Sequence, residues 1–146
     1  MEGVYVIPTK KIVNDRGFLQ EVQRNDETTY PGFGQVYITA TNPGFIKAWY
    51  RHHIQTDQIS LVSGEMLVVL YDSREGSATR NEIKEIILNE ENPLLIQIPT
   101  GVWHGFKTIG DKPALLLHLN TVPYNFENVD EDRLPTDDPT IPYLWS

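Results

Sequence analysis

The sequence predicts an all-β protein, a sandwich or barrel of the jelly-roll type. Short runs of β-branched and aromatic residues recur from one end of the chain to the other, and clusters of turn residues separate them. The one window with some helical periodicity is "RNEIKEIILNEE" (80–91), and its isoleucines fit a strand as well as a helix. Many short strands at regular spacing are typical of antiparallel sandwiches and barrels.

The expected strands follow one another from the N-terminus. They cover residues 4–8, 18–23, 35–41, 45–52, 58–72, 82–89, 94–99, 103–109 and 113–120. Ser63 and Gly64 interrupt the fifth run and predict a hairpin turn there. The acidic, proline-rich segment 124–146, here called the C-terminal tail, is expected to wrap around the body, held by Tyr143 and Trp145. No repeat or linker is found, so residues 1–146 are expected to form one domain.

Composition excludes several classes of function. The formal net charge of −8 argues against a nucleic-acid-binding protein, because phosphate binding depends on Lys and Arg. The chain has no cysteine, which rules out disulfides, thiolate metal sites and a cysteine nucleophile. No apolar run approaches the ~18 residues of a membrane span or has the form of a signal peptide. We therefore expect a soluble, cytoplasmic protein without a membrane partner.

Two of the four histidines lie side by side in "AWYRHH" (48–53). Side chains alternate between the two faces of a strand, so Tyr50 and His52 share one face, and Arg51 and His53 share the other. The same alternation pairs Gln35 with Tyr37, and His118 with Asn120. Polar groups on the inward face of a barrel strand line a ligand cavity, because a dry core would leave them unsatisfied. His53 is expected to be a solvated bystander.

Two motifs give the first resemblance to a known class. They are Tyr50, His52, Asp57 and Gly64 in "YRHHIQTDQISLVSG", and Pro99, Gly101 and His104 in "IPTGVWHGF". Together they resemble the two-part cupin pattern, with tyrosine in place of the first histidine and aspartate in place of the glutamate. The resemblance implies a double-stranded β-helix of two antiparallel sheets.

Longer stretches narrow the resemblance to one family. "NDRGFLQEV", "LVSGEMLVVLYDSREGSATRNE", "IPTGVWHGF" and the closing "DDPTIPYLW" resemble the dTDP-4-dehydrorhamnose 3,5-epimerase family over nearly the whole chain. This resemblance implies an isomerase or epimerase that acts on a nucleotide-diphosphate 4-keto sugar by proton transfer, without metal or cofactor, in polysaccharide biosynthesis. It also implies a homodimer that pairs through an N-terminal strand.

The family pattern assigns roles to individual positions. Lys47 aligns with an arginine that binds the diphosphate, Tyr50 with the base histidine, and His118 with the acid tyrosine, so base and acid residue types are exchanged. Asp57 takes the place of an active-site lysine. The resemblance implies catalytic roles for His52, His118, Tyr50 and His104, and binding roles for Arg16, Glu21, Gln35, Tyr37, Lys47 and Arg51.

Three alternatives to a metal-independent epimerase remain open at this point. Sugar 3,4-ketoisomerases of the same fold carry a histidine and a tyrosine that match His52 and Tyr37. A metal-dependent cupin would use His52, Asp57 and His104, because two histidines and a carboxylate can form an open metal site. A catalytically silent relative would bind the nucleotide sugar without exchanging its protons.

Overall fold

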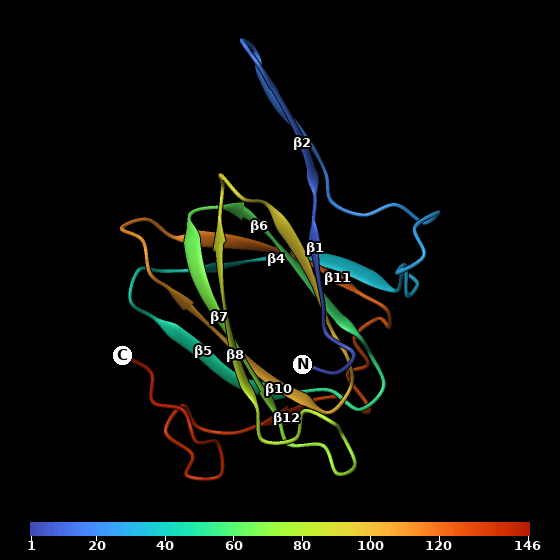
Figure 1. The fold of residues 1–146 in the computed structure, drawn as a ribbon, viewed down its shortest axis with the longest axis vertical. Coiled ribbons are helices and arrows are strands. Elements are labelled where there is room, and N and C mark those ends of the chain that lie inside the picture. Colours follow the sequence, from blue (N-terminus) through green and yellow to red (C-terminus); the bar gives the residue numbers. More distant parts are fainter.

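The computed structural model describes all 146 residues and confirms the predicted all-β fold. Twelve strands form two five-stranded antiparallel sheets and one separate hairpin (Figure 1). Residues 83–89, where the sequence left helix and strand open, are a strand. No α-helix is present, and so none that could cross a membrane.

The two sheets face each other as the layers of a double-stranded β-helix. The first sheet has the order β1 (Tyr5–Pro8), β9 (Leu94–Ile98), β6 (Asp57–Ser63), β11 (Ala114–Asn120) and β4 (Gln35–Thr41). The second has the order β12 (Asp132–Arg133), β5 (Ile46–Arg51), β10 (Val102–Thr108), β7 (Glu65–Asp72) and β8 (Ile83–Asn89). From β4 to β11 the chain changes sheet at every step except between β7 and β8. Residues distant in sequence therefore meet between the sheets.

The turn at Ser63 and Gly64 is present, but the predicted hairpin is wrong. Strands β6 and β7 belong to different sheets, so the turn carries the chain from one layer to the other. Gly64 has a φ of +91°, and a Cβ there would lie 2.9 Å from the Pro113 carbonyl oxygen and from the Ala114 Cα. The turn thus requires glycine for both conformation and space.

The hydrophobic core fills one part of the space between the sheets and gives way to polar groups beyond it. On β6 the inward positions run from Leu61 and Ile59, both in the core cluster, to the buried Asp57. On β11 they run from Leu116 in the core to the buried His118. Buried polar groups on these two neighbouring strands of one sheet indicate a site rather than a continuation of the core.

The C-terminal tail packs on the outside of the second sheet. Ile141 is buried in a second cluster with Trp49 and Trp103, and Tyr143 and Trp145 flank it. The tail also contains β12, which pairs with the end of β5 (Figure 1). The tail therefore reaches the same strand end that carries the predicted histidines.

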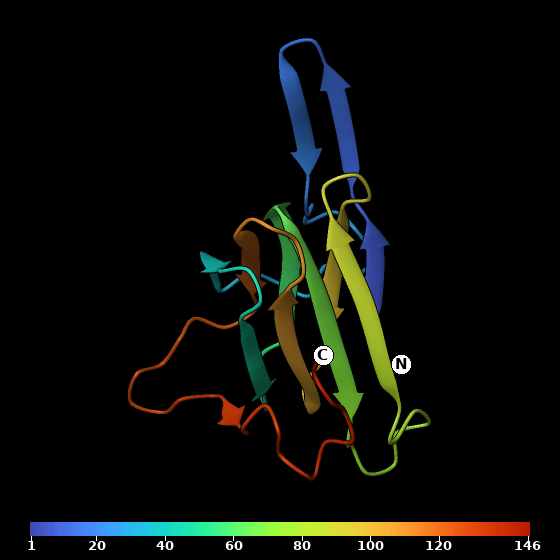
Figure 2. The ribbon, with the colours of Figure 1, turned by 90° about the vertical axis from the view of Figure 1, so that its left-hand side faces the viewer.

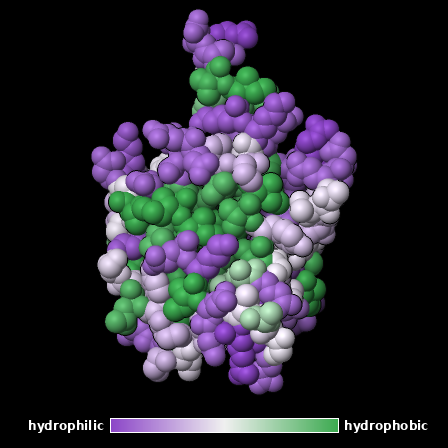
Figure 3. Space-filling view, in the orientation of Figure 1, coloured by the Kyte–Doolittle hydropathy of each residue, from purple (hydrophilic) through white to green (hydrophobic).

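Strands β2 (Lys10–Asn14) and β3 (Gly17–Glu21) form a hairpin that projects from the body (Figure 2). Its apolar side chains have little to pack against: Val13 is 71% exposed and Phe18 is 58% exposed. In the space-filling view, hydrophobic residues also gather on the face of the body below the hairpin (Figure 3). The hairpin therefore exposes apolar side chains that the body of the protein does not cover.

Candidate active site

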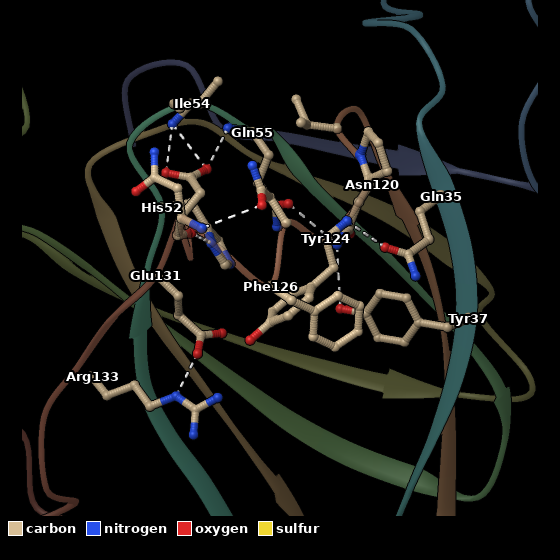
Figure 4. A pocket seen from close by; sticks show the side chains of 15 residues that line it. Gln35, Tyr37, His52, Ile54, Gln55, Asn120, Tyr124, Phe126, Glu131 and Arg133 are labelled. Carbon is tan, nitrogen blue, oxygen red and sulfur yellow. Dashed lines mark hydrogen bonds and ion pairs between the residues drawn. The ribbon is translucent and has the colours of Figure 1, made fainter.

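Two adjoining cavities open between the sheets at the polar end of the core. The larger has a volume of about 430 Å³ and the smaller about 120 Å³, and both are lined by Tyr37, His52 and Glu131. The larger volume lies in the range of small-molecule sites, roughly 300–1,000 Å³. Figure 4 shows His52 and Gln55 on one side of the larger cavity and Tyr37, Asn120 and Gln35 on the other.

His52 presents a free nitrogen to this space. It follows directly after β5, and its Nδ1 lies 2.5 Å from the carbonyl oxygen of Asp130 in the tail. A carbonyl oxygen only accepts hydrogen bonds, so the proton is on Nδ1 and the electron pair is on Nε2. The Asp130 carboxylate in turn accepts backbone N–H bonds from His53, Ile54 and Gln55. The tail therefore fixes both the tautomer and the segment that carries the ring.

Tyr37 on β4 and His118 on β11 form the facing wall. Their rings stack with centroids 4.5 Å apart, and Asn120 Nδ2 donates to the Tyr37 hydroxyl at 3.3 Å. Burial and the nearby Asp57 carboxylate raise the pKa of Tyr37 to about 12. His118 Nε2 lies 2.9 Å from the Thr39 hydroxyl. Tyr37 therefore keeps its proton at neutral pH, whereas one His118 nitrogen is already engaged.

A buried carboxylate lies between two buried histidines at the base of the smaller cavity. Asp57 Oδ2 is 3.3 Å from His104 Nε2, and Asp57 Oδ1 is 3.8 Å from His118 Nδ1. Burial acts to raise the pKa of Asp57, but His104 and His118 outweigh it and hold that pKa well below its ordinary range. His104 Nδ1 donates to the Val102 carbonyl at 3.1 Å. This bond orients the His104 ring so that its Nε2 faces the carboxylate.

The structure brings most of the predicted site residues together. Those that line the two cavities are Gln35, Tyr37, Lys47, Tyr50, His52, His104 and His118, together with Asp57 of the alternative metal set. Lys47 lines the smaller cavity and donates from Nζ to the Ala40 carbonyl at 2.7 Å. Strand alternation is a correct guide for Tyr50 and His52. It fails for Lys47, which has the opposite parity to Tyr50 and reaches the same cavity because the register of β5 shifts between the two residues.

Three predicted binding residues lie elsewhere. Arg51 points away from the cavity: its Nε donates to Asp132 at 3.0 Å and its guanidinium lies 4.4 Å from the centre of the Trp103 ring. The alternation places it on the outer face, and no bulge reverses that. Arg16 and Glu21 belong to the projecting hairpin and line neither cavity of their own chain.

Sequence reasoning missed the contribution of the tail. Glu131 and Arg133 line the larger cavity, the Arg133 guanidinium lies 5.5 Å from the centre of the Tyr50 ring, and Tyr124 and Phe126 form an edge-to-face pair 4.8 Å apart. The one feature of the sequence that could have marked this part of the tail is the charged stretch "NVDEDR" (128–133). Its residues follow no strand or helix period, so the sequence does not predict which of their side chains face the cavity.

The fold and the cavity define a class of protein: a cupin-type double-stranded β-helix with histidine, tyrosine and carboxylate side chains around an intersheet ligand site. Within that class the chain belongs to the dTDP-4-dehydrorhamnose 3,5-epimerase family, whose sequence model matches residues 1–146. This confirms the resemblance seen in the sequence and places the chain among nucleotide-sugar epimerases.

Curated relatives and solved structures agree with this assignment. The spore coat polysaccharide biosynthesis protein SpsL of Bacillus subtilis is 40% identical over 146 residues, which is 100% of this chain and 97% of that protein. The probable low-salt glycan biosynthesis epimerase Agl13 of Haloferax volcanii is 42% identical over 91% of this chain and 86% of that protein. The structure of a dTDP sugar isomerase from Desulfovibrio desulfuricans G20 superposes with a TM-score of 0.93 at 33% identity, covering 99% of this chain and 91% of that one.

Proposed function

We propose that this protein epimerises a dTDP-linked 4-keto-6-deoxy sugar by metal-independent proton transfer, in the biosynthesis of a surface polysaccharide. The observation that carries the proposal is the His52 ring, whose Nδ1 proton is committed to Asp130 while its Nε2 electron pair faces the cavity. An imidazole held in this tautomer is a competent base near neutral pH. The family membership and the relatives' names supply the substrate class.

The reaction needs groups on both faces of the sugar. A 4-keto sugar has acidic protons at C3 and C5, and inversion requires a base on one face and an acid on the other. His52 follows β5 in one sheet, and Tyr37 lies on β4 in the other, with its hydroxyl protonated. We assign the base to His52 and the acid to Tyr37, with Tyr50 as a second hydroxyl beside His104. His118 positions the Tyr37 ring by stacking on it.

The enolate that forms at C4 needs a positive group nearby. Position 57, a lysine in the family pattern, is an aspartate here, and its charge is balanced by His104 and His118. Lys47 is the one lysine or arginine that lines the smaller cavity. We assign to Lys47 the stabilisation of the developing oxyanion, which is commonly the largest single contribution to such reactions.

The larger cavity fits the nucleotide diphosphate. Arg133 supplies a guanidinium at its edge, and Tyr124 and Phe126 supply aromatic surface for a base. Charge-assisted hydrogen bonds from an arginine to a phosphate are each worth about 1.5–3 kcal/mol. We assign diphosphate binding to Arg133, in addition to the residues that the family pattern indicates.

Replacement of His52 tests the assignment of the base. We expect His52→Ala to lower turnover by ~10²–10⁴, the usual contribution of one positioned acid or base. His53→Ala is the matched control, because His53 is exposed and its ring contacts only Asp132 on the outer face. We expect it to cost less than about threefold in turnover. Equal losses in the two variants would refute the assignment of faces.

We also propose a homodimer in which the projecting hairpin packs against a second copy of the chain. The hairpin carries Arg16 and Glu21, which the family pattern associates with ligand binding but which line no cavity of their own chain. Its exposed Val13, Phe18 and Leu19 need a partner surface. Docking of the hairpin on a second copy of the chain would bury these three side chains. It would also bring Arg16 and Glu21 next to that second copy.

A further inference from the structure

We propose that Asn120 is a positioning residue for the reaction, because it directs the proton of the Tyr37 hydroxyl toward the sugar. Asn120 is the last residue of β11 and is 4% exposed. It nevertheless lines the larger cavity, where it contacts Tyr37. The proposal rests on the proposed function, in which Tyr37 is the acid, and adds the group that makes the Tyr37 proton available.

The Tyr37 hydroxyl has one hydrogen-bond partner within the protein, and that partner is a donor. Asn120 Nδ2 donates to the Tyr37 oxygen at 3.3 Å. A phenol has one proton to donate and lone pairs that accept, whereas an amide N–H can only donate. The bond from Asn120 therefore occupies a lone pair and leaves the hydroxyl proton for a group in the cavities that Tyr37 lines.

Other contacts hold the Tyr37 ring itself, so rotation of the O–H bond is the freedom that Asn120 restricts. Tyr37 pairs in register with His118 across β4 and β11, and the two rings stack at an interplanar angle of 10°. A hydroxyl proton rotates to suit its partners. With the Asn120 N–H directed at the oxygen, the orientation in which the hydroxyl proton points at this amide is excluded.

A chain of hydrogen bonds from the other side of the larger cavity holds the Asn120 amide in turn (Figure 4). Asn120 Nδ2 also donates to Gln55 Oε1 at 3.5 Å, and the Gln55 backbone N–H donates to the Asp130 carboxylate at 2.9 Å. The carbonyl oxygen of the same Asp130 accepts the Nδ1 proton of His52. The chain thus links the proposed acid on β4 to the proposed base, which follows β5 in the other sheet.

Such a chain fixes the separation of acid and base before the sugar binds. Proton transfer requires the donor and the reacting atom in a near-attack geometry, and a displacement of about 1 Å can cost about 10²-fold in rate. Arg133, Tyr124 and Phe126, to which we assign the nucleotide, form no hydrogen bond with Asn120. Loss of the Asn120 amide should therefore lower turnover without weakening the binding of dTDP.

A double-mutant cycle between Asn120 and Tyr37 tests this proposal, with a dTDP-linked 4-keto-6-deoxy sugar as the substrate. Asn120→Leu keeps the branching at Cγ but has no polar atom, and we expect it to lower turnover about tenfold and to change the affinity for dTDP less than about threefold. In a Tyr37→Phe background the same substitution should cost less than about twofold, because the hydroxyl through which Asn120 acts is already gone. Asn92→Leu is the matched control, because Asn92 lies in an exposed turn and lines neither cavity, and it should keep wild-type turnover.

Deuterium incorporation from D₂O measures turnover in the slow variants, calorimetry measures dTDP binding, and circular dichroism shows whether each variant is folded. Asn120→Ala replaces Asn120→Leu in the cycle if the leucine variant does not fold. An equal loss of turnover in both backgrounds would overturn the proposal, because it would show that Asn120 does not act through Tyr37. A loss of dTDP affinity as large as the loss of turnover would overturn it too. A wild-type protein without turnover would instead refute the proposed function, and this inference with it.

Discussion

Asp57 stands where the family pattern has a lysine, and the structure shows how the change of charge is accommodated. The carboxylate lies between His104 and His118, so its negative charge is compensated locally. A carboxylate without such partners would repel an enolate that forms next to it. In the structure Asp57 faces these imidazoles, and Lys47 lines the same cavity from β5 in the opposite sheet. The cationic role at the enolate that we propose for Lys47 therefore falls to a position that is already basic in the family pattern.

Tyr37 gives a prediction at the scale of one atom. We expect Tyr37→Phe to lower turnover by ~10²–10⁴, because it removes the proposed acid, and to change the affinity for dTDP less than about threefold. The pKa of Tyr37 is raised to about 12, so its hydroxyl keeps its proton up to at least about pH 10. We therefore expect no loss of activity from ionisation of Tyr37 below that pH. Stopped assays and calorimetry with dTDP measure the two quantities.

Tyr5→Phe is the matched control, because Tyr5 lies on β1, is 53% exposed and lines neither cavity. Full turnover in Tyr37→Phe would show that another group donates the proton, and Tyr50 would then be the next candidate. A loss of dTDP affinity as large as the loss of turnover would make Tyr37 a binding residue.

At the scale of elements, hydrogen bonds to one buried carboxylate, that of Asp72, stabilise the turn between β7 and β8. Asp72 accepts hydrogen bonds from Arg74 Nε at 2.8 Å and from the hydroxyls of Ser77 and Thr79 at 2.7 Å. Arg74 and these hydroxyls hold the pKa of Asp72 well below its ordinary range, although burial opposes them. A depressed carboxyl pKa stabilises the fold above the pKa of the unfolded chain, and this contribution is lost as the pH falls.

We therefore expect the free energy of unfolding to fall below about pH 4, and Asp72→Asn to make this fall shallower. At pH 7 the variant should lose about 2 kcal/mol, the worth of hydrogen bonds to a charged group. Urea denaturation over a pH series measures both effects. Asp111→Asn, in an exposed turn, is the control, and a wild-type pH dependence retained in Asp72→Asn would contradict this account.

The elements also show what the sequence could and could not predict. Strand alternation correctly predicts that Tyr50 and His52 face inward, because the two-residue period leaves no other choice once one face is buried. Arg51, to which the resemblance gave a binding role, lies on the outer face that the same rule indicates. Arg133 was missed because it lies on the two-residue strand β12 in an otherwise irregular tail, whose course depends on contacts such as that of Ile141 with Trp49. The Ser63–Gly64 turn was recognised, but turn residues do not reveal which sheet the next strand joins.

At the scale of the whole molecule, the projecting hairpin predicts the oligomeric state. We expect light scattering at micromolar concentration to give twice the mass of one chain, because the apolar hairpin needs a second copy to cover it. Phe18→Asp should shift the protein toward the monomer. Leu144→Asp is the matched control, because Leu144 is 90% exposed in the tail. A wild-type monomer under these conditions would refute the dimer.

Proton exchange at the sugar is the central claim, and deuterium incorporation tests it most directly. The purified protein is incubated with a dTDP-linked 4-keto-6-deoxy sugar in D₂O, and NMR locates the deuterium. We predict label at both C3 and C5, since His52 and Tyr37 face the same cavity from opposite sheets. Label at C3 alone with a displaced keto group would indicate a ketoisomerase instead. Binding of the sugar without any incorporation would contradict the proposed reaction and indicate a catalytically silent binding protein.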